Sequence, residues 1–128
     1  MSIPVPPQFV LLYVASPQAS AQFYARLLGT PPVEASPTFA MFALPGGLML
    51  GLWGRDGVQP APSAQPGAME LGFPVADEAA VRQRYAQWQA QGLTLLQAPT
   101  TMDFGWTFTA ADPDGHRLRV FAPHPQQG

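Results

Sequence analysis

Glu70 and Arg119 carry the polar chemistry that this sequence places on its expected β-strands, in a chain where only 11% of the residues are charged. A carboxylate beside a guanidinium could orient the polar edge of a ligand, because charge-assisted hydrogen bonds are short and directional. The same pair could instead form a salt bridge that serves the fold alone. The sequence leaves both roles open.

Aromatic residues offer a second chemistry, which is the stacking of a flat ligand. Side chains alternate between the faces of a strand, so Phe9 and Tyr13 share one face, as do Gly51 and Trp53. An aromatic-walled cleft on these faces would hold a planar compound, with Gly51 leaving room for it; ordinary core packing is the alternative. For Trp53 and Trp106, contact with a ligand is the favoured interpretation over core packing, because both flank expected loops and each indole N–H needs a partner.

Other reactive groups lack the neighbours that catalysis requires. The chain has no cysteine, which excludes disulfides, zinc–thiolate sites and thiol nucleophiles. His116 and His124 have no Ser, Asp or Glu at motif spacing, so a catalytic triad is unsupported. Asp103 falls in an expected loop, where it could accept a hydrogen bond from a ligand or could simply be solvated.

The composition argues against several classes of function. The chain has 128 residues, of which 47% are apolar, and its net charge of −2 includes no basic run, which argues against nucleic-acid binding. Residues 1–7 lack the charge and the apolar run of a signal peptide, and no stretch is long enough to span a membrane. We therefore expect a cytoplasmic protein with no nucleic-acid or membrane partner.

The candidate residues fall in two copies of one βαβββ unit. The units are expected at about residues 8–53 and 68–122, and a segment rich in Pro, Gly and Ser, residues 54–67, links them. This linker is long enough to join two halves of one subunit or to exchange halves between two subunits. Superposition of the two copies pairs Phe9 with Glu70, and Gly51 with Arg119.

Each unit has a helix whose ends are marked by the sequence. The first helix is expected to start at the capping residue Ser16, followed by Pro17, and to end near Gly29. The second is expected to start at Asp77 and to end near Gly92, with Trp88 on its packed face.

Several short strings in the sequence resemble those of a known family. They are Val14-Ala-Ser-Pro17, Phe23-Tyr24, Leu28-Gly29 and the turn Asp112-Pro-Asp-Gly115. Together with the duplication, they resemble the vicinal oxygen chelate superfamily of glyoxalases, bleomycin-resistance proteins and extradiol dioxygenases. The resemblance implies one α+β domain over residues 1–128, in which two βαβββ units form curved sheets around a ligand cleft. The segment 42–53 most resembles the branch that confers resistance to phenazine antibiotics.

Enzymes of this superfamily bind one divalent metal through His or Glu at four strand positions. Carried over to this sequence, those positions are Phe9, Gly51, Glu70 and Arg119. Only Glu70 can act as a ligand, because phenylalanine and glycine offer no donor atom and arginine is a permanent cation. The resemblance therefore implies a member with no metal and no cofactor.

We expect this protein to bind and sequester a small planar aromatic compound, such as a phenazine-like antibiotic, without catalysis. The expected ligand-binding residues are Phe9, Tyr13, Gly51, Trp53, Glu70, Asp103, Trp106 and Arg119. The main alternative is a metal-dependent enzyme of the glyoxalase or dioxygenase type, and a sensor of a metabolite is a third possibility. Family precedent also implies a homodimer, which the linker could make domain-swapped.

Overall fold

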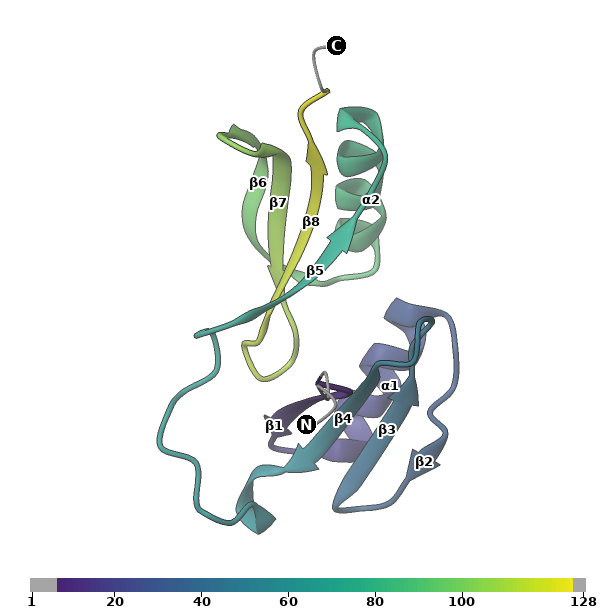
Figure 1. Cartoon of the computed structure of the whole chain (residues 1–128), viewed down its shortest axis with the longest axis vertical. Coiled ribbons are helices and arrows are strands. Elements are labelled where there is room, and N and C mark those ends of the chain that lie inside the picture. The colour runs from purple at the N-terminus through teal and green to yellow at the C-terminus, as the bar shows by residue number, and fades with distance from the viewer. Residues whose placement is uncertain (1–6, 126–128) are drawn as a thin grey trace, which may run out of the picture. The chain divides into compact units, whose positions relative to one another are not determined.

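Each half of the chain folds as a four-stranded mixed sheet with one helix, which confirms the predicted α+β class (Figure 1). The computed structural model describes residues 7–125. Residues 1–6, where the sequence predicts no signal peptide, and residues 126–128 lie outside the described part. The boundary between two compact units falls between Ser63 and Ala64.

The two units repeat one order of elements. In the first unit they are β1 (Phe9–Val14), α1 (Pro17–Leu28), β2 (Glu34–Ala35), β3 (Phe39–Ala43), β4 (Met49–Gly54) and the 3-10 turn η1 (Arg55–Gly57). In the second unit they are β5 (Glu70–Pro74), α2 (Glu78–Ala90), β6 (Thr94–Met102), β7 (Gly105–Ala111) and β8 (Arg117–Pro123). The predicted pair of βαβββ units is therefore confirmed.

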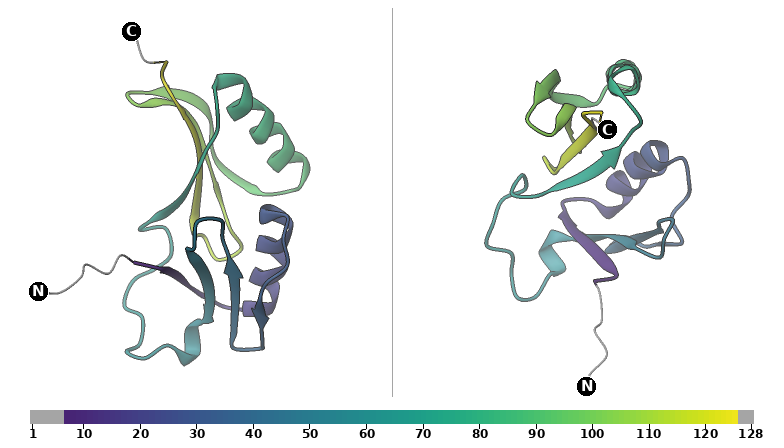
Figure 2. Two further views of the ribbon diagram at one scale, coloured as in Figure 1. Left: turned by 45° about the vertical axis from the view of Figure 1, so that its right-hand side comes forward. Right: turned by 45° about the horizontal axis from the view of Figure 1, so that its top comes forward.

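The sheets of the two units also share one topology (Figure 2). The strand orders are β1-β4-β3-β2 and β5-β8-β7-β6. In each sheet the first and last strands of the unit pair in parallel, and the remaining neighbours pair antiparallel. The last strand of each unit is thus a central strand with a partner on both sides.

The helices begin where the sequence predicts. The Ser16 side chain accepts a hydrogen bond from the Ala19 backbone N–H at 3.1 Å, and Gly29 ends α1 in the left-handed conformation with φ of 70°. In α2, Asp77 accepts a hydrogen bond from the Ala80 N–H at 2.9 Å. Both side chains satisfy backbone donors that the first turn of a helix leaves unpaired.

Each helix covers one face of its own sheet and forms the core there. Trp88, on α2, is only 3% exposed and makes edge-to-face contacts with Phe73 of β5 and Phe108 of β7. This places Trp88 in the core, as expected. The other fully buried large residues include Tyr24, Phe42, Leu50 and Leu52 in the first unit, and Val81, Leu118 and Val120 in the second.

The opposite face of each sheet is left uncovered by its helix, and it is called the open face from here on. Alternation along β1 puts Leu12 and Val14 under α1, so Phe9, Leu11 and Tyr13 belong to the open face of the first unit. In residues 7–125, every helix is too short or too polar to cross a membrane.

Candidate functional site

Arg119 lies at the centre of the open face of the second unit. It belongs to β8, between Gly72 of β5 on one side and Thr109 of β7 on the other. Its neighbours in the strand, Leu118 and Val120, are fully buried on the α2 side. Because side chains alternate along a strand, the guanidinium extends over the open face.

Four hydrogen bonds hold the Arg119 guanidinium in place. Nε donates to Oε2 of Glu70, and Nη2 donates to Oε1 of the same carboxylate at 3.3 Å. Nη1 donates to Thr107 Oγ1 at 3.1 Å and reaches Gln97 Oε1 at 3.5 Å. These contacts use most of the five N–H groups that a guanidinium presents, so its orientation is fixed from three sides.

Two threonines and a glutamine extend this arrangement across the sheet. Thr109 Oγ1 donates to Gln97 Oε1 at 2.8 Å, and Thr107 Oγ1 donates to the Val120 carbonyl at 2.8 Å. Both threonines are buried, which makes them the polar part of an otherwise apolar strand. We call the following set the polar row: Glu70, Gln97, Thr107, Thr109 and Arg119.

Sequence reasoning identified two members of the polar row and missed the other three. Thr107 and Thr109 alternate with Phe108 in β7, and this period of two was the signal that could have placed both threonines on one face. Gln97 carried no such signal, because its position depends on an irregular pairing of β6 with β7.

The ion pair of the polar row is only partly buried. The side chains of Arg119 and Glu70 are 21% and 36% exposed. A partly solvated pair of this kind contributes between about 0 and 1 kcal/mol to stability. The pair therefore explains little of the folding energy, and its oxygen and nitrogen atoms stay within reach of a ligand.

The open face of the first unit is aromatic instead of polar. Tyr13 and Trp53 pair across β1 and β4, and their rings meet edge to face with centroids 6.2 Å apart. Both side chains are half-buried, and Phe9, at the start of β1, is 56% exposed. The structure thus brings Tyr13 and Trp53 together and places Phe9 on the same face.

Gly51 does not leave the open space that the sequence suggested. A Cβ atom built on Gly51 would lie 2.5 Å from Leu11 Cδ2 and 3.1 Å from Phe39 Cζ. The missing side chain is therefore replaced by the ends of two neighbouring side chains on the same face. Gly51 lets these two residues pack over β4, and the expectation of an empty slot above it was wrong.

Trp106 lies on the other face of its sheet from the polar row. It alternates with Thr107 in β7 and shares the α2 side with Phe108. Its ring packs against His124, with centroids 4.9 Å apart, and His124 Nε2 lies 3.0 Å from the Met102 carbonyl oxygen. The structure therefore does not bring Trp106 together with Glu70 and Arg119.

Asp103 occupies the turn between β6 and β7, as the predicted loop position requires. Its side chain is exposed at the tip of this hairpin. The neighbouring Phe104 is 44% exposed and contacts the Phe121 ring edge to face. The hairpin places Asp103 in solvent, and a contact with a ligand remains a prediction.

The four positions implied for a metal do not form a set of ligands. The pairing supports their equivalence, because Gly51 lies opposite Leu11 and Arg119 opposite Gly72, two residues beyond Phe9 and Glu70 respectively. Among them only Glu70 has a donor atom, and Arg119 binds its carboxylate. Within residues 7–125, no group of three or more His, Cys, Asp or Glu side chains is arranged to hold a metal ion. The residues present do not fit a divalent metal.

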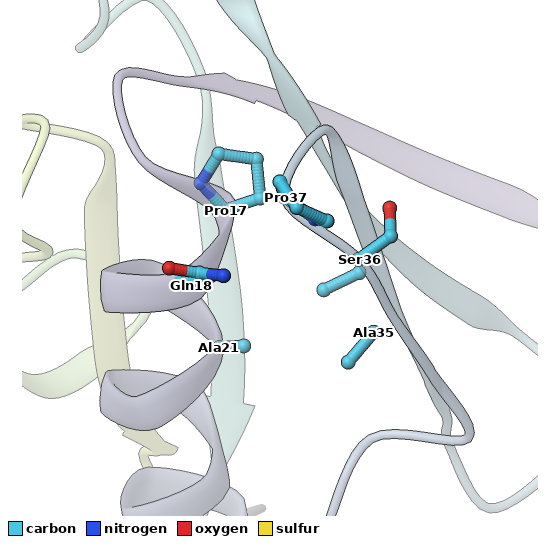
Figure 3. Close-up of a pocket in the computed structure, with 7 residues that line it drawn as sticks. Pro17, Gln18, Ala21, Ala35, Ser36 and Pro37 are labelled. Carbon is cyan, nitrogen blue, oxygen red and sulfur yellow. The ribbon is translucent and has the colours of Figure 1, made fainter.

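A small pocket lies in the first unit, between the start of α1 and the segment around β2 (Figure 3). Its volume is about 170 Å³, and drug-sized ligands occupy pockets of roughly 300–1,000 Å³. It is lined by Pro17, Gln18, Ala21, Ala35, Ser36, Pro37 and Ala40. The predicted site residues are not part of this lining, and the pocket is too small for a three-ring compound.

Comparison with known proteins places this geometry in context. Residues 7–120 match the family described as Glyoxalase/Bleomycin resistance protein/Dioxygenase superfamily. The phenazine antibiotic resistance protein EhpR of Enterobacter agglomerans is 29% identical over 119 residues, which cover 91% of both chains.

Solved structures with the same fold support this match. A protein of Agrobacterium tumefaciens, whose structure was determined by NMR in solution, is 52% identical with a TM-score of 0.86, covering 94% of this chain and 99% of that one. A glyoxalase-related enzyme from Fulvimarina pelagi is 26% identical with a TM-score of 0.79, covering 91% of this chain and 87% of that one.

Proposed function

This chain belongs to the Glyoxalase/Bleomycin resistance protein/Dioxygenase superfamily, and from that membership we propose that it is a drug-resistance protein. It binds a small planar aromatic compound of the phenazine type and sequesters it without chemical change. The similarity to a phenazine antibiotic resistance protein over 91% of the chain supports the class of ligand. Sequestration requires the protein and the compound to share a compartment, for which we propose the cytoplasm.

The aromatic open face of the first unit carries this proposal. Trp53 offers a rigid stacking surface, and Tyr13 holds its ring from the side at a centroid distance of 6.2 Å. Among the described residues, the Trp53 indole N–H has no hydrogen-bond partner, so it can donate to a ligand. Each aromatic pair contributes about 0.5–1.5 kcal/mol beyond the burial of apolar area, which suits a flat ring system.

The donor set supports binding without catalysis. The implied metal positions hold one carboxylate, which is already bound by Arg119, so the chemistry shared by the enzymes of this superfamily has no ligands here. A metal-dependent enzyme of the glyoxalase or dioxygenase type is the alternative. Elemental analysis distinguishes the sequestering protein from the enzyme. We expect far less than one zinc, iron, manganese or nickel ion per chain. About one metal ion per chain would favour the enzyme.

A titration with phenazine tests the function directly. We expect quenching of tryptophan fluorescence that saturates at one ligand per chain, followed by recovery of the unaltered compound from the complex. Binding of the folded state should also raise the melting temperature by mass action. A chemically altered compound would replace sequestration with catalysis, and the lack of any binding would remove the proposed ligand class.

We also propose that the protein is a homodimer. Within residues 7–125, each sheet ends in strands that pair on one side only, β1 and β2 in the first unit and β5 and β6 in the second. Such edges are usually covered by other chain segments, since they otherwise promote uncontrolled association. Light scattering should give twice the chain mass of 13.7 kDa at micromolar concentration, and the single-chain mass would contradict the dimer.

A further inference from the structure

The polar row has a hydrogen-bond donor and an acceptor that are available to a ligand, on Gln97 and Glu70. Gln97 Oε1 accepts from Thr109 at 2.8 Å and lies 3.5 Å from an Arg119 nitrogen, which directs the amide nitrogen away from both. Among the residues that the structure describes, that nitrogen reaches only the Met102 sulfur, at 3.8 Å, and a thioether is a weak acceptor. Gln97 therefore retains a donor, while the partly exposed Glu70 carboxylate retains lone pairs as an acceptor.

A β-bulge in β6 puts Gln97 in this position. Leu95 pairs with Ala110 and Gln97 with Thr109, so two steps along β6 match one step along β7. Leu96 is the extra residue, and it is 50% exposed. A regular strand would place Leu96 opposite Thr109, whereas the bulge places an amide there. Bulges often re-aim a side chain in this way beside a functional site.

The charge of Arg119 is balanced before any ligand binds. Glu70 takes two of its hydrogen bonds, and Thr107 and Gln97 hold its third nitrogen. The guanidinium is pre-organised, so little ordering is required when a ligand arrives. An anionic ligand would have to compete with the Glu70 carboxylate and would also be repelled by it.

We propose that Glu70 makes the polar row selective for uncharged planar compounds whose edge carries both a hydrogen-bond donor and an acceptor. A primary carboxamide has this edge: its N–H groups suit Glu70, and its oxygen suits Gln97 or Arg119. A carboxylate of the same shape has no donor and shares the charge of Glu70. The inference rests on the proposed function, because it concerns the planar aromatic ligand proposed above.

Two probes of nearly identical shape test this selectivity. Phenazine-1-carboxamide and phenazine-1-carboxylate are titrated into the wild type and Glu70→Gln at neutral pH. We expect the wild type to bind the carboxamide more tightly. In Glu70→Gln, which keeps the shape and removes the charge, the ratio of affinities should move about five- to ten-fold toward the carboxylate. Arg117 is exposed on the same face with its Cα opposite Glu70, and its positive charge attracts the carboxylate in both proteins. This attraction is common to the wild type and the variant, so the change in the ratio reports the contribution of Glu70.

Two further variants guard against a general structural effect. Gln97→Glu adds a negative charge to the row and should move the ratio the other way, toward the carboxamide. Glu78→Gln is the matched control, because Glu78 also pairs with an arginine, Arg82, at 3.0 Å, but on the exposed surface of α2. We expect its ratio to equal that of the wild type.

The outcomes separate this inference from the function on which it rests. A wild type that prefers the carboxylate, an unchanged ratio in Glu70→Gln, or the same shift in Glu70→Gln and Gln97→Glu overturns the inference alone. If the wild type binds neither compound, both the proposed function and the inference that rests on it are contradicted.

Discussion

The two units share one backbone plan, but the open faces of their sheets are chemically different. At equivalent positions, the first unit has Phe9 and Gly51 where the second has Glu70 and Arg119. The first face is completed by the edge-to-face pair of Tyr13 and Trp53, and the second by the threonines and glutamine of the polar row. By contrast, the buried strand residues on the helix-covered faces of both sheets are apolar, among them Leu12 and Leu52 in the first unit and Phe108 and Leu118 in the second.

This difference shows which part of a duplicated fold is free to diverge. A covered face must be apolar, because burying a polar group without a partner costs about 1–3 kcal/mol. An open face is less constrained, because polar side chains there can reach solvent or pair with one another, as Glu70 and Arg119 do. The repeated topology therefore sets the positions of the candidate site residues, and the side chains at those positions set the chemistry.

The largest expected effect tests the covered face of the second unit. Trp88→Ala should lower the free energy of unfolding by about 3–5 kcal/mol, since it removes a nearly buried ring from between Phe73 and Phe108. Urea denaturation followed by circular dichroism measures the change. Gln87→Ala, on the exposed side of the same helix, is the control and should change stability little. Similar effects of both variants would contradict the assignment of Trp88 to the core.

The aromatic open face is tested by the affinity for phenazine. Trp53→Ala should weaken binding by about 1–3 kcal/mol, because it removes the proposed stacking surface. Trp106→Ala is the matched control, since the structure places this ring on the opposite side of the second sheet from the polar row. Isothermal titration calorimetry on both folded variants checks the contrast. Equal losses would return Trp106 to the ligand-binding residues.

Two glycines that lie opposite Leu11 and Arg119 sharpen the comparison of the open faces. Gly51→Ala should destabilise the protein by about 1 kcal/mol, because crowding against Leu11 and Phe39 exceeds the gain from a less flexible unfolded chain. Gly72→Ala should change stability by less than about 1 kcal/mol, because the added Cβ meets only Phe121 Cε1, at 3.3 Å, and a small shift of that ring offsets the gain from a less flexible unfolded chain. Thermal denaturation measures both; a stabilised Gly51→Ala would mean that Leu11 moves aside without cost.

The smallest expected effect concerns the stability that the ion pair contributes. Glu70→Gln should change the free energy of unfolding by less than about 1 kcal/mol, because the pair is partly solvated and the amide oxygen can still accept from Arg119. Glu78→Gln should give a change of similar size for the same reason. A loss of several kcal/mol in Glu70→Gln would mean that the polar row exists mainly to stabilise the second unit.

Much of the fold could be predicted because its signals are local. Ser16 and Asp77 cap helices by bonding backbone groups three residues away, and the alternation in residues 9–14 depends only on neighbours in the chain. The internal repeat added the equivalence of Phe9 with Glu70. The chemical types at the implied metal positions were also fixed in the sequence itself, since no fold can give phenylalanine or glycine a donor atom.

Only the tertiary structure decided how the site residues meet. Gln97 joins Arg119 because a bulge shifts the register of β6, and Leu11 fills the space above Gly51 because β1 lies beside β4. Each of these contacts joins residues from different strands. Their positions depend on strand register and side-chain packing, to which many distant residues contribute, and no local pattern in the sequence encodes them.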